Sequence, residues 1–318
     1  MRGYLSQADR VVTAVPTGRA QQPRPAHRAA NIAQHGDRTD MPSVAVVTGA
    51  SSGIGLATTR ALAAAGWKVI ATARRPETAE SLREIAHELP GMELRTLDVT
   101  SDESVDLCIR SILTDLGGID LLVNNAGAGH RGTLEQLSMD ELSQSMELNF
   151  FGVARVTKAV LPAMRAARTG RVITVTSLNG VVALPFSDAY NAAKFAVEGL
   201  MESLATVMRE FDVYISVLEP GPVRTAFFAN VGGHVDNISD DDPYAELINR
   251  FNARMAALGS GGQSAESVAD VIREIAADPS PALRYQSSEQ SRAIAAQKLV
   301  DTTGRSILAA TRTMLHPG

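Results

Sequence analysis

The sequence predicts a doubly wound α/β fold, in which helices cover both faces of a parallel sheet, and two observations indicate it. Short apolar runs alternate with amphipathic helical stretches from residue 44 onward, with short connections and no internal repeat. The runs are apolar throughout rather than at every second position, which is typical of parallel strands buried on both faces. Such sheets bind ligands at the carboxyl ends of their strands, so the loops there carry the candidate site.

The expected elements follow in a regular order. We expect strands at 44–47, 68–73, 93–97, 120–123, 171–176 and 213–218. We expect helices at 55–65, 77–89, 101–116, 140–165 and 188–211. Ser101 is the expected cap of the third helix, because a serine hydroxyl can accept a hydrogen bond from a first-turn amide.

Residues 1–40 differ in composition from the rest of the chain. They contain six Arg, three Asp and three Pro but no Glu or Lys, and they show little periodicity. We expect either a disordered extension or an untranslated upstream segment, because Met41 stands where the fold would begin. A single domain is expected at 41–286, with a variable substrate loop at 228–262 and a helical C-terminal extension at 287–318.

The composition argues against several functional classes. Of the 318 residues, 45% are hydrophobic and 20% are charged, as in ordinary globular proteins. The net charge of −5 and the absence of a basic run argue against a nucleic acid as partner. No apolar run approaches the length of a membrane span. The single cysteine, Cys108, lies in an amphipathic stretch and is expected in the core, which indicates a reducing, cytoplasmic compartment.

A glycine-rich loop follows the first strand and opens into the first helix, with the sequence Thr48-Gly-Ala-Ser-Ser-Gly-Ile-Gly55. Glycines let the backbone turn tightly and approach a diphosphate, whose charge meets the free amides at the helix N-terminus. The position between strand and helix predicts a dinucleotide site. Its expected contacts are Gly49, Ser51, Ser52, Gly53, Ile54 and Gly55.

Two arginines, Arg74 and Arg75, follow the second strand, where an NAD site usually places an acid for the ribose hydroxyls. Guanidinium groups suit a 2′-phosphate by charge and by paired hydrogen bonds. We therefore expect NADP(H) as the cofactor, with Arg74 as the phosphate contact. Arg75 is either a second contact or a solvated loop residue.

Tyr190 and Lys194 lie four positions apart in the last expected helix, so their side chains share one face. A free phenol has a pKa of about 10. An ammonium about 5 Å away, at an effective dielectric of about 20, contributes roughly 3 kcal/mol, or about two pKa units. Tyr190 is therefore a candidate acid–base group, and Ser177, after the fifth strand, would offer a hydroxyl to the same substrate oxygen.

Together these motifs resemble the short-chain dehydrogenase/reductase family, whose Rossmann-type fold matches the expectation above. Besides the glycine loop, Ser177 and the Tyr190-x-x-x-Lys194 pair, four further motifs carry the resemblance. They are Leu97-Asp98-Val99, Asn124-Asn125-Ala126-Gly127, Asn149, and Pro220-Gly221-Pro222-Val223-Arg224-Thr225. The resemblance extends from about residue 43 to the C-terminus.

The resemblance implies a role for each matching residue. Tyr190 would be the acid–base group, Ser177 would polarise the carbonyl, and Lys194 would lower the Tyr190 pKa and bind the nicotinamide ribose. Asn149 would hold a water that links Lys194 to a proton relay. Further cofactor contacts would come from Asp98 and Val99 at the adenine, from Asn125, Ala126 and Gly127 along the cofactor, and from Pro220, Gly221, Val223 and Thr225 at the nicotinamide.

A narrower resemblance points to the branch of 17β-hydroxysteroid and retinol dehydrogenases. It is carried by Leu184-Pro-Phe-Ser-Asp188, Phe195-Ala-Val-Glu-Gly-Leu200 and Leu283-Arg284-Tyr285. We therefore expect an NADP(H)-dependent oxidoreductase that interconverts an alcohol and its ketone or aldehyde on a lipophilic, steroid- or retinoid-like substrate. The alternatives are a generalist carbonyl reductase and a dinucleotide sensor without turnover.

The remaining candidates carry less chemistry. His130 and His234 are interpreted as solvated loop residues, although His130 could line the pocket mouth. No group of His, Cys and carboxylates has metal-ligand spacing, and hydride transfer with a tyrosine acid needs no metal, so no metal site is expected. The family resemblance implies a homodimer or homotetramer formed through the helices expected at 140–165 and 188–211.

Overall fold

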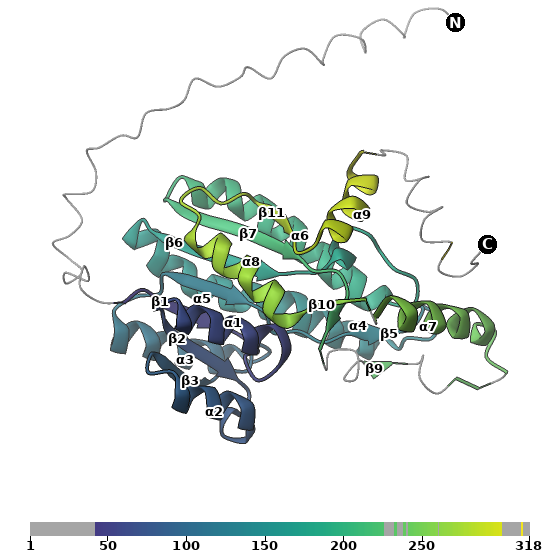
Figure 1. The fold of residues 1–318 in the computed structure, drawn as a ribbon, viewed down its shortest axis with the longest axis horizontal. Coiled ribbons are helices and arrows are strands. Elements are labelled where there is room, and N and C mark those ends of the chain that lie inside the picture. The colour runs from purple at the N-terminus through teal and green to yellow at the C-terminus, as the bar shows by residue number, and fades with distance from the viewer. Residues whose placement is uncertain are drawn as a thin grey trace, which may run out of the picture. The chain divides into compact units, whose positions relative to one another are not determined.

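The central sheet has seven strands, all parallel, in the order β11-β7-β6-β4-β1-β2-β3 (Figure 1). Its strands are β1 (Val44–Val47), β2 (Lys68–Ala73), β3 (Met92–Thr96), β4 (Leu121–Asn124), β6 (Gly170–Val175), β7 (Val213–Glu219) and β11 (Arg284–Gln286). From β1 the chain adds β2 and β3 on one side and then crosses to β4 on the other. A crevice therefore opens at the carboxyl ends of β1 and β4, where such folds bind nucleotides.

The computed structural model describes residues 42–225, 232–233, 238–239, 241–259, 261–300 and 313. The expectations for residues 1–40, for His234, for parts of the 228–262 loop and for nearly all of the chain beyond 300 lie outside these residues.

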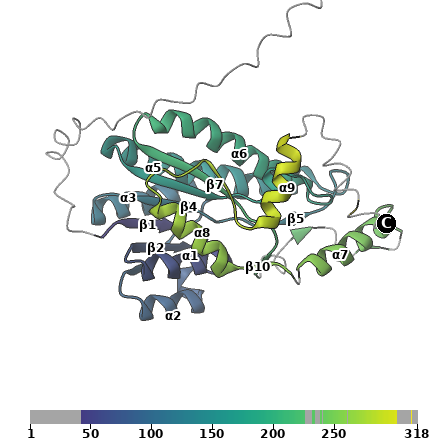
Figure 2. The same cartoon turned by 45° about the horizontal axis from the view of Figure 1, so that its top comes forward.

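Helices cover both faces of the sheet, which confirms the doubly wound fold (Figure 2). Successive residues of β1 point to opposite faces of the sheet, because side chains in a strand have a period of two. Val46 packs in a core with α3 (Asp102–Leu116), α5 (Gly152–Ala167) and α6 (Asp188–Arg209). Val47 packs in a second core with α1 (Gly53–Ala64), α2 (Glu80–Glu88) and α8 (Ala265–Ala277).

The start of α3 follows the expected chemistry. The Ser101 side chain accepts a hydrogen bond from the amide of Ser104 at 3.2 Å, which confirms the predicted cap. Asp102 and Glu103 in the first turn complement the positive end of the helix dipole. Cys108 is a buried, free cysteine in the core, as expected, and burial raises the pKa of its thiol to about 11.

The long helix expected at 140–165 is divided in the structure. It consists of α4 (Met139–Met146), a π-helical turn at Glu147–Phe151 and α5. The Asn149 side chain donates to the carbonyls of Ser145 and Ala128 and accepts from the amide of Ala128. The bonds to Ala128 join segments 21 residues apart, so the helical spacing of the sequence could not predict this turn. Turns of π-helix often lie at functional sites.

Shorter elements complete the edge of the sheet that carries the site. β5 (His130–Arg131) pairs with β9 (Gly232–Gly233), and β8 (Val223–Arg224) pairs with β10 (Gln263–Ser264). Two helices follow the site region, α7 (Ala245–Gly259) and α9 (Glu289–Val300). Within the part of the chain that is described, we find no helix with the length and apolarity needed to cross a bilayer.

Candidate active site

The glycine-rich loop lies between β1 and α1 and leaves no room for side chains. Gly49 has φ of 65° and Gly53 has φ of 55°, a region that L-residues with side chains rarely adopt. A Cβ at Gly49 would lie 2.8 Å from Cα of Ala126, and one at Gly55 would lie 2.3 Å from the Gly49 carbonyl oxygen. The loop therefore holds the backbone at the N-terminus of α1, where free amides and the helix dipole favour an anion.

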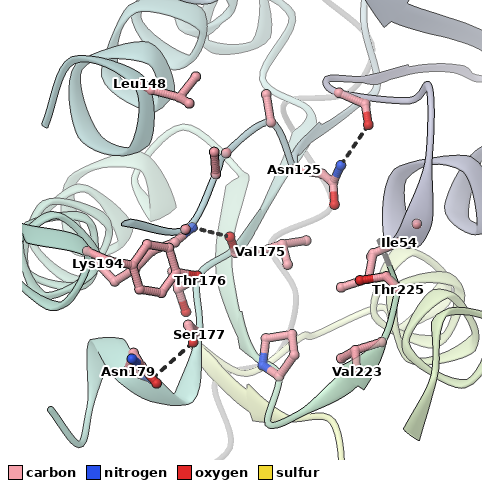
Figure 3. Close-up of a pocket in the computed structure, with 18 of the residues that line it drawn as sticks. Ile54, Asn125, Leu148, Val175, Thr176, Ser177, Asn179, Lys194, Val223 and Thr225 are labelled. Carbon is pink, nitrogen blue, oxygen red and sulfur yellow. Dashed lines mark hydrogen bonds between the residues drawn. The ribbon is translucent and has the colours of Figure 1, made fainter. Parts of the chain in front are cut away.

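The opposite wall comes from the turn that follows β4. The Thr48 hydroxyl accepts hydrogen bonds from the amides of Asn125 at 2.9 Å and Ala126 at 3.0 Å. The Asn125 side chain donates to the carbonyls of Thr48 and Gly49, and the dashed line at Asn125 in Figure 3 marks one of these bonds. These bonds fasten the turn to the glycine loop. No role was predicted for Thr48, although its place at the end of β1 was an available signal.

The ends of β2 and β3 contribute the polar rim of the same cavity. Arg74 lines the cavity and is exposed, whereas Arg75 does not line it. Asp98 accepts two hydrogen bonds from Thr100, at 2.9 and 2.7 Å. Although burial opposes ionisation, these bonds and the charges of Arg74 and Arg155 hold the pKa of Asp98 below its usual value. Of the two adjacent arginines, only Arg74 is therefore placed to contact a bound cofactor in this cavity.

Three of the four predicted catalytic residues line the other end of the cavity. Ser177 follows β6, and Tyr190 and Lys194 lie in the first turns of α6. The Ser177 and Tyr190 side chains are hydrogen-bonded, and the Lys194 Nζ atom lies 5.6 Å from the centre of the Tyr190 ring. Lys194 donates to the Val175 carbonyl at 3.2 Å, as Figure 3 shows.

Asn149 lies next to this cluster but does not line the cavity. It is 1% exposed, and the three hydrogen bonds described above occupy its amide. Gly127 separates it from the cavity: a Cβ there would lie 2.7 Å from Oδ1 of Asn149 and 3.8 Å from Nζ of Lys194. The side chain of Asn149 thus holds the backbone of the turn after β4, close to Lys194.

Burial controls the protonation of the two ionisable groups. It raises the pKa of Tyr190 to about 12, although the hydrogen bond with Ser177 acts in the opposite direction. It lowers the pKa of Lys194 to about 8, against the effect of the Glu198 charge. The expected lowering of the phenol pKa is therefore wrong for this arrangement, because loss of water outweighs the interactions that stabilise the phenolate. Tyr190 keeps its proton at neutral pH.

The segment after β7 forms the wall between the two ends of the cavity. Pro220, Gly221, Val223 and Thr225 line it, and the Pro220 carbonyl accepts a hydrogen bond from the amide of Leu178 at 2.8 Å. In Figure 3, Val223 and Thr225 lie on the side of Ile54, across the cavity from Ser177 and Lys194. Thr225 stands close to the glycine loop, 3.3 Å from the place of a Cβ at Gly53.

Apolar side chains also line the cavity. They are Leu148, Leu178, Leu184, Phe251 and Met255. Phe251 packs edge-on against Phe186, with 5.4 Å between ring centres. Phe251 and Met255 fall within the substrate loop expected at 228–262, but neither residue was singled out, because α7 carries no motif.

His130 also lines this cavity, so its interpretation as a solvated residue is wrong. Its side chain is only 19% exposed, and its Nε2 atom lies 3.5 Å from a carboxylate oxygen of Glu141. Its backbone belongs to β5, which pairs with β9.

The cavity suits a dinucleotide along its whole length. Its volume is about 730 Å³, and it extends from Arg74 past the glycine loop to Ser177 and Tyr190. Backbone cradles that a Cβ would fill, at Gly49 and Gly127, lie along it. Among the described residues, no group of three or more His, Cys, Asp or Glu side chains is placed to hold a metal ion.

Comparison with known proteins establishes the family. A profile of the short chain dehydrogenase family matches residues 43–235, more than half of the chain. The protein therefore belongs to the short-chain dehydrogenases, a family of oxidoreductases that use NAD(H) or NADP(H) and act on small molecules. This result confirms the family resemblance and the oxidoreductase class.

Two relatives place the chain within the family. Human retinol dehydrogenase 8 is 36% identical over 284 residues, which cover 86% of this chain and 90% of that protein. Human 17-beta-hydroxysteroid dehydrogenase type 1 is 37% identical over 279 residues, which cover 84% of each protein. The chain is thus related to retinol and hydroxysteroid dehydrogenases.

Solved structures share the fold. A short-chain dehydrogenase from Streptomyces avermitilis is 32% identical with a TM-score of 0.73, covering 86% of this chain and 97% of that one. An alcohol dehydrogenase from the archaeon Thermococcus sibiricus, complexed with 5-hydroxy-NADP, is 29% identical with a TM-score of 0.62. That comparison covers 77% of this chain and 95% of the other.

Proposed function

We propose that the protein is an NADP(H)-dependent oxidoreductase that interconverts an alcohol and its ketone or aldehyde. The observation that carries the proposal is the convergence of Ser177, Tyr190 and Lys194 at one end of a cavity that extends past the glycine loop to Arg74. A proton donor and a cation thus stand where a nicotinamide ring would meet a substrate. The bound cofactor would supply or accept the hydride.

The residues of the chain would handle the proton and the charge on oxygen. Tyr190 donates its phenol proton to the carbonyl oxygen as negative charge develops there, and the Ser177 hydroxyl stabilises that charge with a second hydrogen bond. Lys194, which lies beside the Tyr190 ring, stabilises the phenolate left behind. Asn149 positions the turn at Gly127, against which the cofactor would lie.

The protonation of Tyr190 favours carbonyl reduction. With a pKa of about 12, the phenol is protonated throughout the neutral range and can donate at once. Alcohol oxidation requires the phenolate as a base, and the phenolate fraction falls about tenfold for each pH unit below the pKa. Tyr190 is therefore in the protonation state that carbonyl reduction requires near neutral pH.

Arg74 supports NADP(H) over NAD(H). It lines the cavity at the end of β2, where a 2′-phosphate would need a cation. An NAD site usually has an acidic residue at this position, and this chain has Arg74 there. The related alcohol dehydrogenase bound to 5-hydroxy-NADP is in keeping with this choice.

The apolar lining of the cavity supports a lipophilic substrate. Leu148, Leu184, Phe251 and Met255 line the cavity, and apolar lining suits a steroid- or retinoid-like carbonyl compound, in keeping with the names of the two human relatives. His130 adds a polar group to the lining.

A homo-oligomer completes the proposal. α5 and α6 lie side by side on one face of the sheet, and Phe151, next to α5, is 47% exposed. Large apolar side chains at a surface favour burial against a second copy. Light scattering coupled to size-exclusion chromatography tests it: a mass of about 34 kDa would contradict an oligomer, since one chain weighs 33.7 kDa.

The experiment that tests the function is a turnover assay with purified protein. Oxidation of NADPH, with NADH in parallel, is measured against small ketones, retinal and estrone-like steroids. Saturable oxidation of NADPH with a bulky lipophilic carbonyl supports the proposal, and broad turnover of small polar ketones alone would favour a generalist reductase. Binding of NADPH without turnover of any carbonyl would favour a dinucleotide sensor.

A further inference from the structure

The helix α6 carries a third ionisable group in line with Tyr190 and Lys194. Glu198 follows Lys194 by four positions, so the three side chains share one face of the helix. Glu198 is 5% exposed, nearly as buried as Lys194 at 4%. A carboxylate out of water is costly unless cations and hydrogen bonds surround it, so its neighbours indicate its role.

Arg284 of β11 holds one oxygen of Glu198. Its Nη1 atom contacts Oε2 of Glu198 and lies 3.0 Å from Oε1 of Glu219, which is fully buried. Its Nη2 atom lies 2.5 Å from Glu202, an exposed residue one turn further along α6. Gln286 donates to the second oxygen of Glu219 at 2.9 Å. Glu198 is thus fixed from a strand 86 residues away.

One guanidinium therefore serves two buried carboxylates, and Glu198 is left short of positive charge. Burial raises the pKa of Glu198 to about 7, and the charge of Glu219 adds to this effect, while Thr176 and Arg284 oppose it. The Thr176 hydroxyl lies near Glu198 but donates to the Leu218 carbonyl at 3.1 Å, and no donor meets Oε1 of Glu198 with hydrogen-bond geometry among the described residues. Lys194, four positions earlier on the same helix face, is a second buried cation near Glu198, and the two side chains form no direct ion pair in the described structure.

Glu198 also touches the loop that carries Ser177. A Cβ at Gly180 would lie 3.0 Å from Cγ of Glu198 and 3.2 Å from the carbonyl oxygen of Lys194. From the other elements, the Val175 carbonyl accepts a hydrogen bond from Lys194, and Gly127 lies beside both Lys194 and Asn149. Burial lowers the pKa of Lys194, and the charge of Glu198 acts against that effect.

We propose that Glu198, clamped by Arg284, is the counter-ion that keeps Lys194 protonated in its buried position. Glu198 is a positioning residue: it acts on the reaction only through Lys194. The inference rests on the proposed function, because the charge of Lys194 matters to turnover only if Tyr190 acts as the proton donor.

The test measures the protonation of Lys194 directly. The chain has four lysines, Lys68, Lys158, Lys194 and Lys298, so carbon-13 labelling of lysine gives few side-chain signals, and Lys194→Met assigns the one that matters. In Glu198→Gln the midpoint of the Lys194 titration is expected to fall by about one to three pH units, because an opposite charge that favours the ammonium is lost. The alkaline limb of the pH profile of kcat/KM should move by the same amount.

Glu202→Gln is the matched control. It removes a carboxylate from the same helix and the same arginine, but its side chain is exposed at 61% and lies two turns from Lys194. It is expected to leave the Lys194 midpoint where it stands in the unaltered protein. Glu198→Asp withdraws the carboxylate by one carbon and should lower the midpoint by less than Glu198→Gln. It carries the test if the glutamine variant does not fold by circular dichroism.

An unchanged Lys194 midpoint in the folded Glu198 variants, or an equal fall in Glu202→Gln, would overturn the inference. Turnover and titration separate it from the proposed function. If the unaltered protein reduces no carbonyl and Glu198→Gln still lowers the midpoint, the counter-ion stands and the reaction is wrong. If turnover is found and the midpoint does not move, the reaction stands and the counter-ion is wrong.

Discussion

Backbone groups form one part of the cavity, and ionisable side chains surround the other. At the glycine loop the backbone forms the site: Gly49, Gly53 and Gly55 bring amides together at the start of α1, and no buried charge of the described residues lies beside them. Around Tyr190 side chains form the site, because Lys194, Glu198 and Glu219 are all buried ionisable groups. One end depends on shape, and the other depends on charge held out of water.

The difference predicts how each end fails. A backbone cradle tolerates no added atoms, so it is sensitive to steric change and insensitive to pH. A buried charge tolerates changes of shape better than the loss of a partner, because the remaining charge keeps its desolvation cost. Substitutions at the two ends should therefore separate cofactor binding from turnover.

Tyr190→Phe is expected to give the largest effect, and it falls on the chemical step alone. The substitution removes the proton donor while keeping the ring that packs beside Lys194. Turnover should fall about a hundred- to ten-thousand-fold, the range for a positioned acid–base group. The measurement is kcat with NADPH and the best carbonyl substrate.

The control for Tyr190→Phe is NADPH affinity by calorimetry, which should change little. Equal turnover in the variant would mean that Tyr190 is not the proton donor. A parallel loss of NADPH binding would mean that the two ends of the cavity are not independent.

Gly55→Ala is expected to destroy the other end. Its Cβ would lie 2.3 Å from the Gly49 carbonyl oxygen and 2.5 Å from Nδ2 of Asn125, and the first of these is backbone that cannot turn aside. We expect destabilisation of about 1–3 kcal/mol, the range for overpacking, and loss of NADPH binding. Denaturant unfolding and calorimetry measure the two effects. Unimpaired NADPH binding would contradict the prediction, because it would mean that the loop can accommodate a Cβ at residue 55.

Arg74→Ala is expected to change cofactor choice rather than turnover. A hydrogen bond to a charged group contributes about 1.5–3 kcal/mol, so the KM for NADPH should rise about ten- to hundredfold while that for NADH stays constant. Arg75→Ala is the matched control and should change neither, because Arg75 does not line the cavity. An equal rise for NADH would assign Arg74 to a role other than 2′-phosphate recognition.

The backbone end was predictable from the sequence to a greater degree than the charged end. Glycine spacing, the Ser101 cap and the apolar strands are local patterns, and β1, β2 and α3 lie within a residue of their expected bounds. Likewise the spacing of Tyr190 and Lys194 is enough to place both on one helix face, and the structure brings them to the cavity with Ser177.

What the sequence did not yield depends on contacts between distant segments. The sequence did not predict β11 or α8. It also did not predict that Arg284 contacts Glu198 and Glu219, which lie 86 and 65 positions away in the chain. The direction of the Tyr190 pKa shift was wrong for the same reason: depth of burial is a property of packing, and spacing along a helix does not report it. Glu198 itself could have been found, since it continues the four-residue spacing.

Gly199→Ala gives the smallest expected effect and sharpens the comparison between the two ends. Gly199 lies in α6 next to Glu198, and a Cβ there would meet no atom within 4 Å outside the helix backbone. Alanine should raise the free energy of unfolding by about 0.5–1 kcal/mol, because glycine within a helix loses more backbone entropy on folding. Denaturant unfolding measures the gain.

A loss of stability would indicate that a second copy of the chain covers this face of α6, since no atom of the described chain stands in the way. A gain would mean that a glycine in the charged half can be replaced freely, whereas the glycines of the loop cannot, because only the loop relies on close approach of backbone.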